Sequence, residues 1–362
     1  MNSSTGAFSW TAPPTDAVSW WTGDTLAGGQ AVDAATGGTG TFTSSNPIDD
    51  TFAGSGHAAT DVRGFNDVGH AVVVDSAGRS YVAGSSASGA AAASDDFVIT
   101  RYTAAGVLDT TFGSGGSVIT DFAGLQDEGQ GMVIDSAGRL YVAGHTYNGS
   151  NWDFALARYT TSGVLDSTFG SGGKVTTDFA GRDDLSYGAI ALDASGRVFV
   201  GGYTFDGVSP TFSIACYTSA GVLDSTFGAG GKVTTDINTQ YERINALTVD
   251  SSGRIVAVGF ANNNTDFALA RYTAAGALDS TFGSGGIVVS DFSGAGRDDG
   301  GWAVTIDSSG NILVAGNVSN GSNTDFALAR YTAAGVLDSS FGSGGKVSTD
   351  FTGHDDQAYG VA

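Results

Sequence analysis

The sequence predicts an all-β fold, a β-propeller of six four-stranded blades, and two observations carry this expectation. A segment typified by "LDSTFGSGGKVTTDF" (165–179) returns along the chain, and the Asp of its Leu-Asp pair recurs every 55–60 residues. The chain also contains 57 Gly and only 14% charged residues. A fixed period indicates a repeat fold, and Gly-rich turns between short apolar runs indicate strands. The marker aspartates are Asp49, Asp109, Asp166, Asp224, Asp279 and Asp338.

One repeat, read from 125 to 181, contains four predicted strands. Strand a is expected at 129–135, and a tight turn at 136–139 leads into strand b at 140–146. Strand c is expected at 153–160, where large and small apolar residues alternate, and strand d at 173–179. Four antiparallel strands in a unit of this length are typical of a propeller blade. A β-solenoid is the alternative, although its coils are usually shorter.

The repeats predict five complete blades and one divided blade. Residues 1–39 form an atypical N-terminal segment, and residues 40–362 hold the repeats. The termini are expected to complete the sixth blade together, which leaves no exposed strand edge. Closure by a neighbouring copy, or a longer array of which this chain is a fragment, are the alternatives. The complete blades are expected at about 63–122, 123–179, 180–237, 238–292 and 293–351, and the divided blade at 357–362 plus about 15–62.

The order of motifs resembles a known family. The run "DFALARYTAAGVLDSSFGSGGKVSTDF" (325–351), followed in the other copies by a stretch such as "AVxxDSxGRIxVAG", is similar to the delta-60 repeat, a bacterial repeat. The resemblance covers about 40–362. It implies a β-propeller in a secreted or surface protein, and it supplies no catalytic residues.

The charge balance excludes some functions. The net charge is −22, and among 37 acidic residues only Glu128 and Glu242 are glutamates. Such an acidic body repels nucleic acid. Cys216 is the only cysteine, which excludes an intramolecular disulfide and a multi-cysteine zinc site. No apolar run is long enough to span a bilayer, and no signal peptide is visible. We expect an extracellular or cell-surface location from the Gly-, Ser-, Thr- and Asp-rich, Lys-poor composition.

Variation between the copies is concentrated on one predicted face. The a–b and c–d connections barely change, whereas the b–c and d–a connections differ in length and composition. Binding usually resides in loops on a rigid scaffold. The d–a loops carry acidic residues expected around the mouth of the central channel, either as a Ca²⁺ or polar-ligand site or as caps of strand a. These residues are Asp67, Asp127, Asp183, Asp184, Glu242, Asp298, Asp299, Asp355 and Asp356.

Strand c carries a second repeated set, which we interpret as structural. Each pair has an Asp and an Arg five residues apart, on opposite faces of the strand, so we expect each to bond a neighbouring blade. The third blade lacks both members of the pair. The set comprises Asp96, Arg101, Asp153, Arg158, Asp266, Arg271, Asp325 and Arg330.

These observations favour a non-enzymatic extracellular or cell-surface module with a binding or structural role. Its partner would be a protein or a glycan at the variable face, or another copy of the chain through the termini. Ca²⁺ is the candidate cofactor, and no catalytic residue is assigned. The alternative is a propeller hydrolase or lyase acting on polysaccharide through the channel-mouth carboxylates, with His70 or His354.

Overall fold

The computed structural model describes residues 52–54, 56–89, 95–122, 124–263, 265–294, 298–351 and 353–362, together with the backbone of two short strands. The short strands β1 (Gln30–Val32) and β2 (Thr39–Thr41) pair with each other. The other strands are β3 (Asp67–Val74), β4 (Ser80–Ala87), β5 (Asp95–Tyr102) and β6 (Ser117–Thr120); β7 (Asp127–Ile134), β8 (Leu140–Tyr147), β9 (Trp152–Tyr159) and β10 (Lys174–Thr177); β11 (Asp184–Leu192), β12 (Val198–Phe205), β13 (Pro210–Tyr217) and β14 (Lys232–Thr235); β15 (Arg243–Val249), β16 (Ile255–Ala261), β17 (Asp266–Tyr272) and β18 (Ile287–Ser290); β19 (Gly300–Ile306), β20 (Ile312–Ser319), β21 (Thr324–Tyr331) and β22 (Lys346–Thr349).

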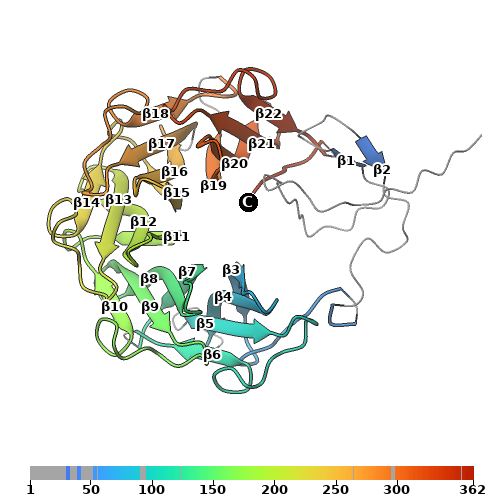
Figure 1. Cartoon of the computed structure of the whole chain (residues 1–362), viewed down its shortest axis with the longest axis vertical. Helices are drawn as coiled ribbons and strands as arrows, with labels where there is room; N and C mark the ends of the chain where they lie inside the picture. The colour runs from blue at the N-terminus through green and yellow to red at the C-terminus, as the bar shows by residue number, and fades with distance from the viewer. Residues whose placement is uncertain are drawn as a thin grey trace, which may run out of the picture.

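These strands form five four-stranded antiparallel sheets, each in chain order, which we call blades 1 to 5. The blades are arranged around a common centre (Figure 1). The inner strands β3, β7, β11, β15 and β19 lie nearest the centre, and the short fourth strands lie at the rim. In blade 2 each strand lies within two residues of its prediction. The described residues contain no helix, so none of them forms a helix that could cross a membrane.

The repeated turn between the first two strands of a blade is held by one aspartate. Asp135 accepts hydrogen bonds from the backbone N–H of Ala137 at 3.0 Å and of Arg139 at 2.9 Å, and from Arg139 Nε at 2.6 Å. Gly138 adopts φ 78°, which glycine tolerates without strain. This chemistry accounts for the near-identity of "DSAGR" in successive copies.

The hydrophobic core lies between blades rather than inside any one of them. One cluster joins Tyr81 and Phe97 of blade 1 to Met132 and Leu140 of blade 2. Three further clusters join blades 2 and 3, 3 and 4, and 4 and 5 in the same way. Each sheet therefore depends on its neighbours for the burial of its faces.

A tyrosine at the end of each third strand ties its blade to the one before. The Tyr159 hydroxyl donates to Thr120 Oγ1, at 2.8 Å, and both side chains are buried. Backbone bonds add to this tie, as from Gly113 N–H to the Ser162 carbonyl at 2.9 Å. The equivalent hydroxyl pairs are Tyr217 with Thr177, Tyr272 with Thr235, and Tyr331 with Ser290.

Buried arginines tie each blade to the next. Arg158, 2% exposed, donates to the Ser219 carbonyl of blade 3 at 2.6 Å and pairs with Asp166 of its own blade at 2.9 Å. Blade 3 has Cys216 at the corresponding position. There, Arg197 of the preceding turn donates to the Ala274 carbonyl of blade 4, at 2.9 Å, in place of the missing arginine.

Both ends of the described chain use the same contacts as complete blades. On the flank of blade 1, Thr60 Oγ1 lies 2.7 Å from the Tyr102 hydroxyl, and Ala53 N–H donates to the Ala105 carbonyl at 2.7 Å. On the flank of blade 5, Ala358 N–H donates to the Gly316 carbonyl at 3.2 Å. Residues 52–62 thus contact blade 1 as a preceding fourth strand would.

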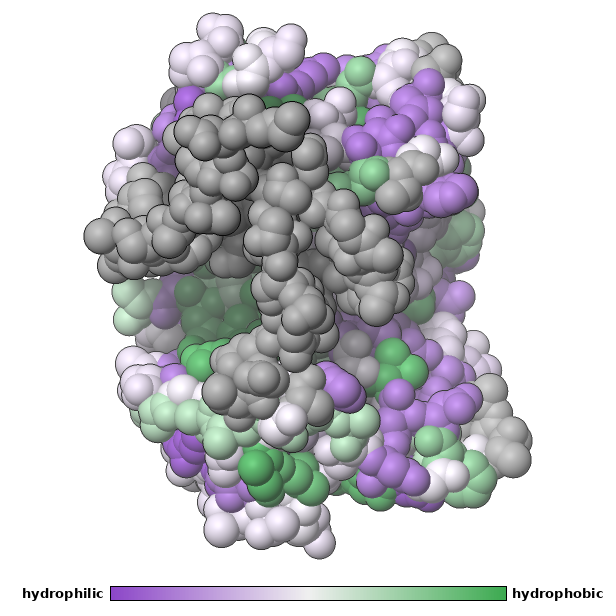
Figure 2. Space-filling model, turned by 90° about the vertical axis from the view of Figure 1, so that its right-hand side faces the viewer, coloured by the Kyte–Doolittle hydropathy of each residue, from purple (hydrophilic) through white to green (hydrophobic). Residues whose placement is uncertain are grey.

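The sixth blade stays a prediction. Most of residues 1–51, which were expected to contribute to the divided blade, lie outside the described residues, and 357–362 pair with no further strand among those described. The flank of blade 1 exposes apolar side chains, with Val72 64% and Val74 59% accessible. Figure 2 views the molecule from this side and shows apolar residues among hydrophilic ones.

Candidate functional site at the channel mouth

Six of the predicted channel-mouth acids hold a fourth strand to the inner strand that follows it. In each d–a loop one carboxylate accepts the backbone N–H of a residue just beyond the preceding fourth strand, as Asp127 does from Phe122 at 2.6 Å. Asp127, Asp184, Glu242 and Asp299 are fully buried. They are caps, which was the structural alternative for this set. The equivalent bonds run from Val62 to Asp67 (2.8 Å), Phe179 to Asp184 (2.6 Å), Ile237 to Glu242 (2.9 Å), Phe292 to Asp299 (2.9 Å) and Phe351 to the partly exposed Asp356 (2.9 Å).

Burial shifts the protonation of three of these caps. It raises the pKa of Asp127 and of Asp184 to about 6 each, and that of Glu242 to about 7. The backbone N–H groups oppose this shift because they favour the charged form. The caps therefore titrate near pH 6 to 7, while at least one oxygen of each accepts a backbone N–H; the other oxygen of Asp127 is buried without a hydrogen-bond partner.

The remaining predicted acids, Asp183, Asp298 and Asp355, are exposed. Asp183 accepts the Trp152 N–H at 3.1 Å, and Asp355 accepts the Thr324 N–H at 2.9 Å, so both tie a d–a loop to the start of the preceding third strand. Asp298 borders a small cavity of about 110 Å³. A wider hollow of about 610 Å³ lies over blade 1.

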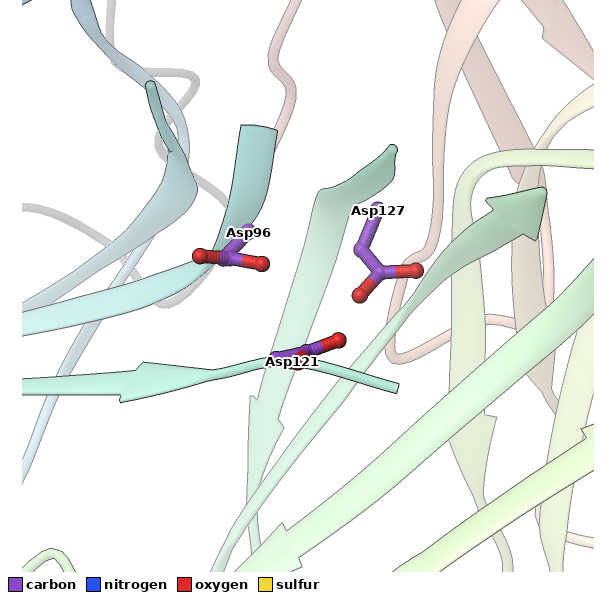
Figure 3. A group of neighbouring side chains, drawn as sticks. All are labelled: Asp96, Asp121 and Asp127. Carbon is purple, nitrogen blue, oxygen red and sulfur yellow. The ribbon is translucent and has the colours of Figure 1, made fainter. Parts of the chain in front are cut away.

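Two groups of three aspartates bring predicted and unpredicted residues together. In the first acidic group, Asp96, Asp121 and Asp127 point toward one another with carboxylate oxygens within 4.8 Å (Figure 3). Arg63 already pairs with Asp96 at 2.5 Å, and the Gly124 N–H donates to Asp121 at 2.5 Å. The second acidic group is Asp153, Asp178 and Asp184. Carboxylate oxygens are Ca²⁺ ligands, and a cation at these groups stays a prediction.

The strand-c residues occupy two different surroundings. Arg101, Arg158 and Arg271 each donate to a backbone carbonyl of the next blade. Arg330 pairs with Asp338 of its own blade at 2.8 Å. The aspartates at the other end of the strand bond nearby side chains instead: Asp96 bonds Arg63, Asp153 bonds Asn148, Asp266 bonds Asn262 and Asp325 bonds Asn320.

The inner strands carry different residues at two equivalent positions in almost every blade. The positions one and three residues after the capping carboxylate vary, whereas the cap itself is Asp or Glu throughout. In each blade the pairing register between the first and second strands shifts across the position three residues after the cap. This shift marks a β-bulge there. Bulges re-aim side chains and are frequent beside functional sites. The first position holds Val68, Glu128, Leu185, Arg243, Gly300 and Gln357, and the third holds His70, Gln130, Tyr187, Asn245, Trp302 and Tyr359.

Several of these side chains meet across blades 3, 4 and 5. Tyr187 stacks with Tyr203 at 6.2 Å between ring centroids, and Tyr203 meets Tyr241 edge-on at 5.8 Å. The Arg243 guanidinium lies 4.1 Å from the centroid of the Tyr187 ring and 5.3 Å from that of Trp302. We call Tyr187, Tyr203, Tyr241, Arg243, Phe260 and Trp302 the channel-mouth cluster.

A histidine and a glutamate approach each other beside this cluster. His145 Nε2 lies 3.6 Å from Glu128 Oε2, and His145 Nδ1 lies 3.0 Å from the Ser186 carbonyl. Burial lowers the pKa of His145, which favours the neutral ring. With Nδ1–H donating to the carbonyl, the lone pair of Nε2 faces Glu128. Trp152 packs against the imidazole at 4.9 Å.

The sequence prediction missed the channel-mouth cluster and two of the acidic residues, Asp121 and Asp178. Both aspartates belong to the invariant fourth-strand segment, which we interpreted as framework. The cluster had a signal in the sequence, since its inner-strand positions vary between otherwise similar copies.

Comparison with solved structures gives matches of low identity. A protein from Lactobacillus plantarum is 14% identical, with 85% of this chain and 75% of that chain covered and a TM-score of 0.44. A GH43 endo-arabinanase from Bacillus licheniformis is 11% identical, with 71% and 92% covered and a TM-score of 0.36. A PL25 ulvan lyase is 9% identical, with 77% and 71% covered and a TM-score of 0.44. The search of curated proteins gave no match.

A family model matches the repeats themselves. The matched residues are 78–112, 138–169, 194–227, 251–282 and 308–341, one stretch in each blade. The name delta-60 stays a prediction, because the matching family has a different description. These five stretches are similar to the β-propeller family model described as a domain of unknown function, DUF5122.

Proposed function

We propose that this chain is a non-enzymatic, extracellular or cell-surface binding propeller whose contact site is the channel mouth on the b–c/d–a face. The observation that carries the proposal is the variation at the inner-strand positions. Blades that keep the same turns, caps and tyrosine ties differ at these two positions of the inner strand. A requirement of the fold would repeat in each blade, whereas contact with one asymmetric ligand requires the blades to differ.

The chemistry of the mouth favours binding over catalysis. The buried caps are hydrogen-bonded to backbone N–H groups and lack free access to a substrate. The partly exposed groups include the rings of Tyr187, Tyr203 and Trp302 and the Arg243 guanidinium. Aromatic faces and a few directed polar groups are typical of ligand sites.

An array of polysaccharides and extracellular-matrix peptides tests this proposal. We expect the full chain to bind one class, Tyr203→Ala to lose at least ten-fold in affinity, and Val164→Ala to bind as wild type does. Val164 is the matched control because it is 60% exposed on a c–d turn at the opposite face. Binding that survives Tyr203→Ala but is lost in Val164→Ala would place the contact on the wrong face.

The second candidate is a polysaccharide hydrolase or lyase, and the approach of His145 to Glu128 favours it. A neutral imidazole beside a carboxylate is a common general-base arrangement. Incubation of the chain with each bound polysaccharide, followed by assays for reducing ends and for unsaturated uronate, separates the candidates. Product formation that Glu128→Gln abolishes would replace the binding proposal. An unchanged polysaccharide supports it.

A further inference from the structure

Arg243 is unusual among the arginines of this acidic chain. Nine others lie within 4 Å of an Asp carboxylate: Arg63, Arg79, Arg101, Arg139, Arg158, Arg197, Arg254, Arg271 and Arg330. Within the described ranges, Arg243 has no carboxylate at that distance, and neither does the loop residue Arg182. The guanidinium of Arg243 is thus an unneutralised positive charge at the mouth of the channel.

Its orientation is fixed by aromatic rings and one amide. The guanidinium lies 4.1 Å from the Tyr187 ring centroid and 5.0 Å from that of Phe260. Nε donates to Asn245 Oδ1 at 2.8 Å, and the Asn245 amide in turn donates to the Gly301 carbonyl at 2.8 Å. An arginine whose fork is held in this way loses little entropy when it binds an anion.

The surroundings of Arg243 suit a flat, hydroxyl-rich ring. Trp302 and Tyr187 are only partly buried, so part of each ring is open to solvent beside the guanidinium and can contact a sugar ring. The cavity of about 110 Å³ beside Trp302 is lined also by Asn317, Gln357 and Asp298, whose amide and carboxylate groups can bond hydroxyls. Trp302 is held in place by its Nε1–H, which donates to Asn317 Oδ1 at 2.5 Å.

We propose that the channel mouth binds an acidic saccharide, with a sugar ring on the aromatic faces and its carboxylate or sulfate on Arg243. This inference rests on the proposed function and names its ligand class. The net charge of −22 repels an anion at long range. At physiological ionic strength that repulsion is screened beyond about 8 Å, so the adjacent guanidinium decides the local preference.

Titration calorimetry of the full chain at physiological ionic strength tests the inference, with tetragalacturonate, its sulfated analogue and uncharged galactotetraose as probes. We expect at least one acidic probe to bind about 10–100-fold more tightly than the uncharged one, the range for a charge-assisted hydrogen bond. Arg243→Gln should abolish this preference while the weaker affinity for galactotetraose persists. Arg139→Gln, which removes a charge from an opposite-face turn, should bind as wild type does.

The outcomes separate this inference from the proposed function. Equal or tighter binding of galactotetraose overturns the acidic-ligand inference and leaves the binding function standing. Retention of the acidic preference in Arg243→Gln also overturns it. If no probe binds, the inference fails and the array alone decides the function. If Arg243→Gln does not fold, the wild-type comparison and Arg243→Lys, which keeps the charge, still decide.

Discussion

Removing one hydroxyl from the tie between blades 1 and 2 should destabilise the protein measurably. Tyr159→Phe keeps the buried ring but deletes the donor to Thr120 Oγ1. Thr120 is 2% exposed, and its hydroxyl would lose this donor. A buried polar group left unsatisfied costs about 1–3 kcal/mol. Because the core of each blade lies against its neighbour, we expect this cost in the free energy of global unfolding.

A double-mutant cycle measures the tie itself. Replacing both partners, in Tyr159→Phe with Thr120→Val, removes the unsatisfied hydroxyl, so the pair should cost about 1 kcal/mol or less. Urea unfolding, followed by tryptophan fluorescence and by circular dichroism, gives the free energy of unfolding of wild type, of each single variant and of the double variant. If the double variant is as unstable as the sum of the two single variants, the hydroxyls are not coupled and this account of the tie is refuted.

The same cycle at Tyr102 and Thr60 examines the N-terminal flank. Their oxygens lie 2.7 Å apart, as in the complete blades. A coupling energy similar to that of Tyr159 and Thr120 would show that residues 52–62 are part of the cooperative fold. Absence of coupling would mean that this segment separates from blade 1 before the rest unfolds.

Three other changes give sharp expectations. Burial raises the pKa of Asp127 to about 6, so the folded chain holds this proton more tightly than the unfolded chain does. Between the ordinary pKa of Asp and 6, the stability that this group contributes therefore falls as pH rises. Asp127→Asn should reduce the loss of unfolding free energy between pH 5 and pH 8, and an unchanged slope of that free energy against pH contradicts the burial argument. A Cβ at Gly173, where φ is 94°, would lie 2.9 Å from Leu165 Cβ, whereas one at Gly172, where φ is 62°, would meet nothing within 4 Å. Gly173→Ala should thus lower the thermal midpoint more than Gly172→Ala, and equal shifts would show that φ alone matters. If the second acidic group takes Ca²⁺, calcium at ten times its Kd should stabilise wild type by about 1.4 kcal/mol and Asp178→Asn by much less; no calorimetric heat and no change in thermal midpoint would exclude the cation.

The strands could be predicted from the sequence because their boundaries are set by local chemistry. Asp135 and Gly138 determine a turn within five residues, and the repeat then places every other turn. The direction in which a loop carboxylate points, by contrast, is not determined by the neighbouring sequence. Asp127 sits where the d–a loop was expected, but its oxygen is turned back to the Phe122 N–H, which only the packed blade specifies.

Variation between the copies could have pointed to the inner-strand members of the channel-mouth cluster, but their mutual contacts could not be predicted because blade packing brings them together. Tyr187, Arg243 and Trp302 stand in successive copies, more than 50 residues apart in sequence. Their approach depends on the spacing of inner strands around the centre and on the bulge in each. Asp121 was missed for another reason, since its identity in each copy favoured a framework role, and its proximity to Asp96 requires the pairing of β5 with β6.

The exchange of Arg197 for the missing arginine at Cys216 shows that these copies are no longer interchangeable. Burial raises the pKa of the Cys216 thiol to about 12, so it stays a neutral, inert filler. Restoring the consensus through Cys216→Arg alone would set two guanidiniums against the one Ala274 carbonyl. The turn arginine itself is common to blades 1 to 4, as Arg79, Arg139, Arg197 and Arg254. The border between blades 3 and 4 therefore marks a divergence at Cys216, where the retained Arg197 takes the carbonyl that the strand arginine contacts elsewhere.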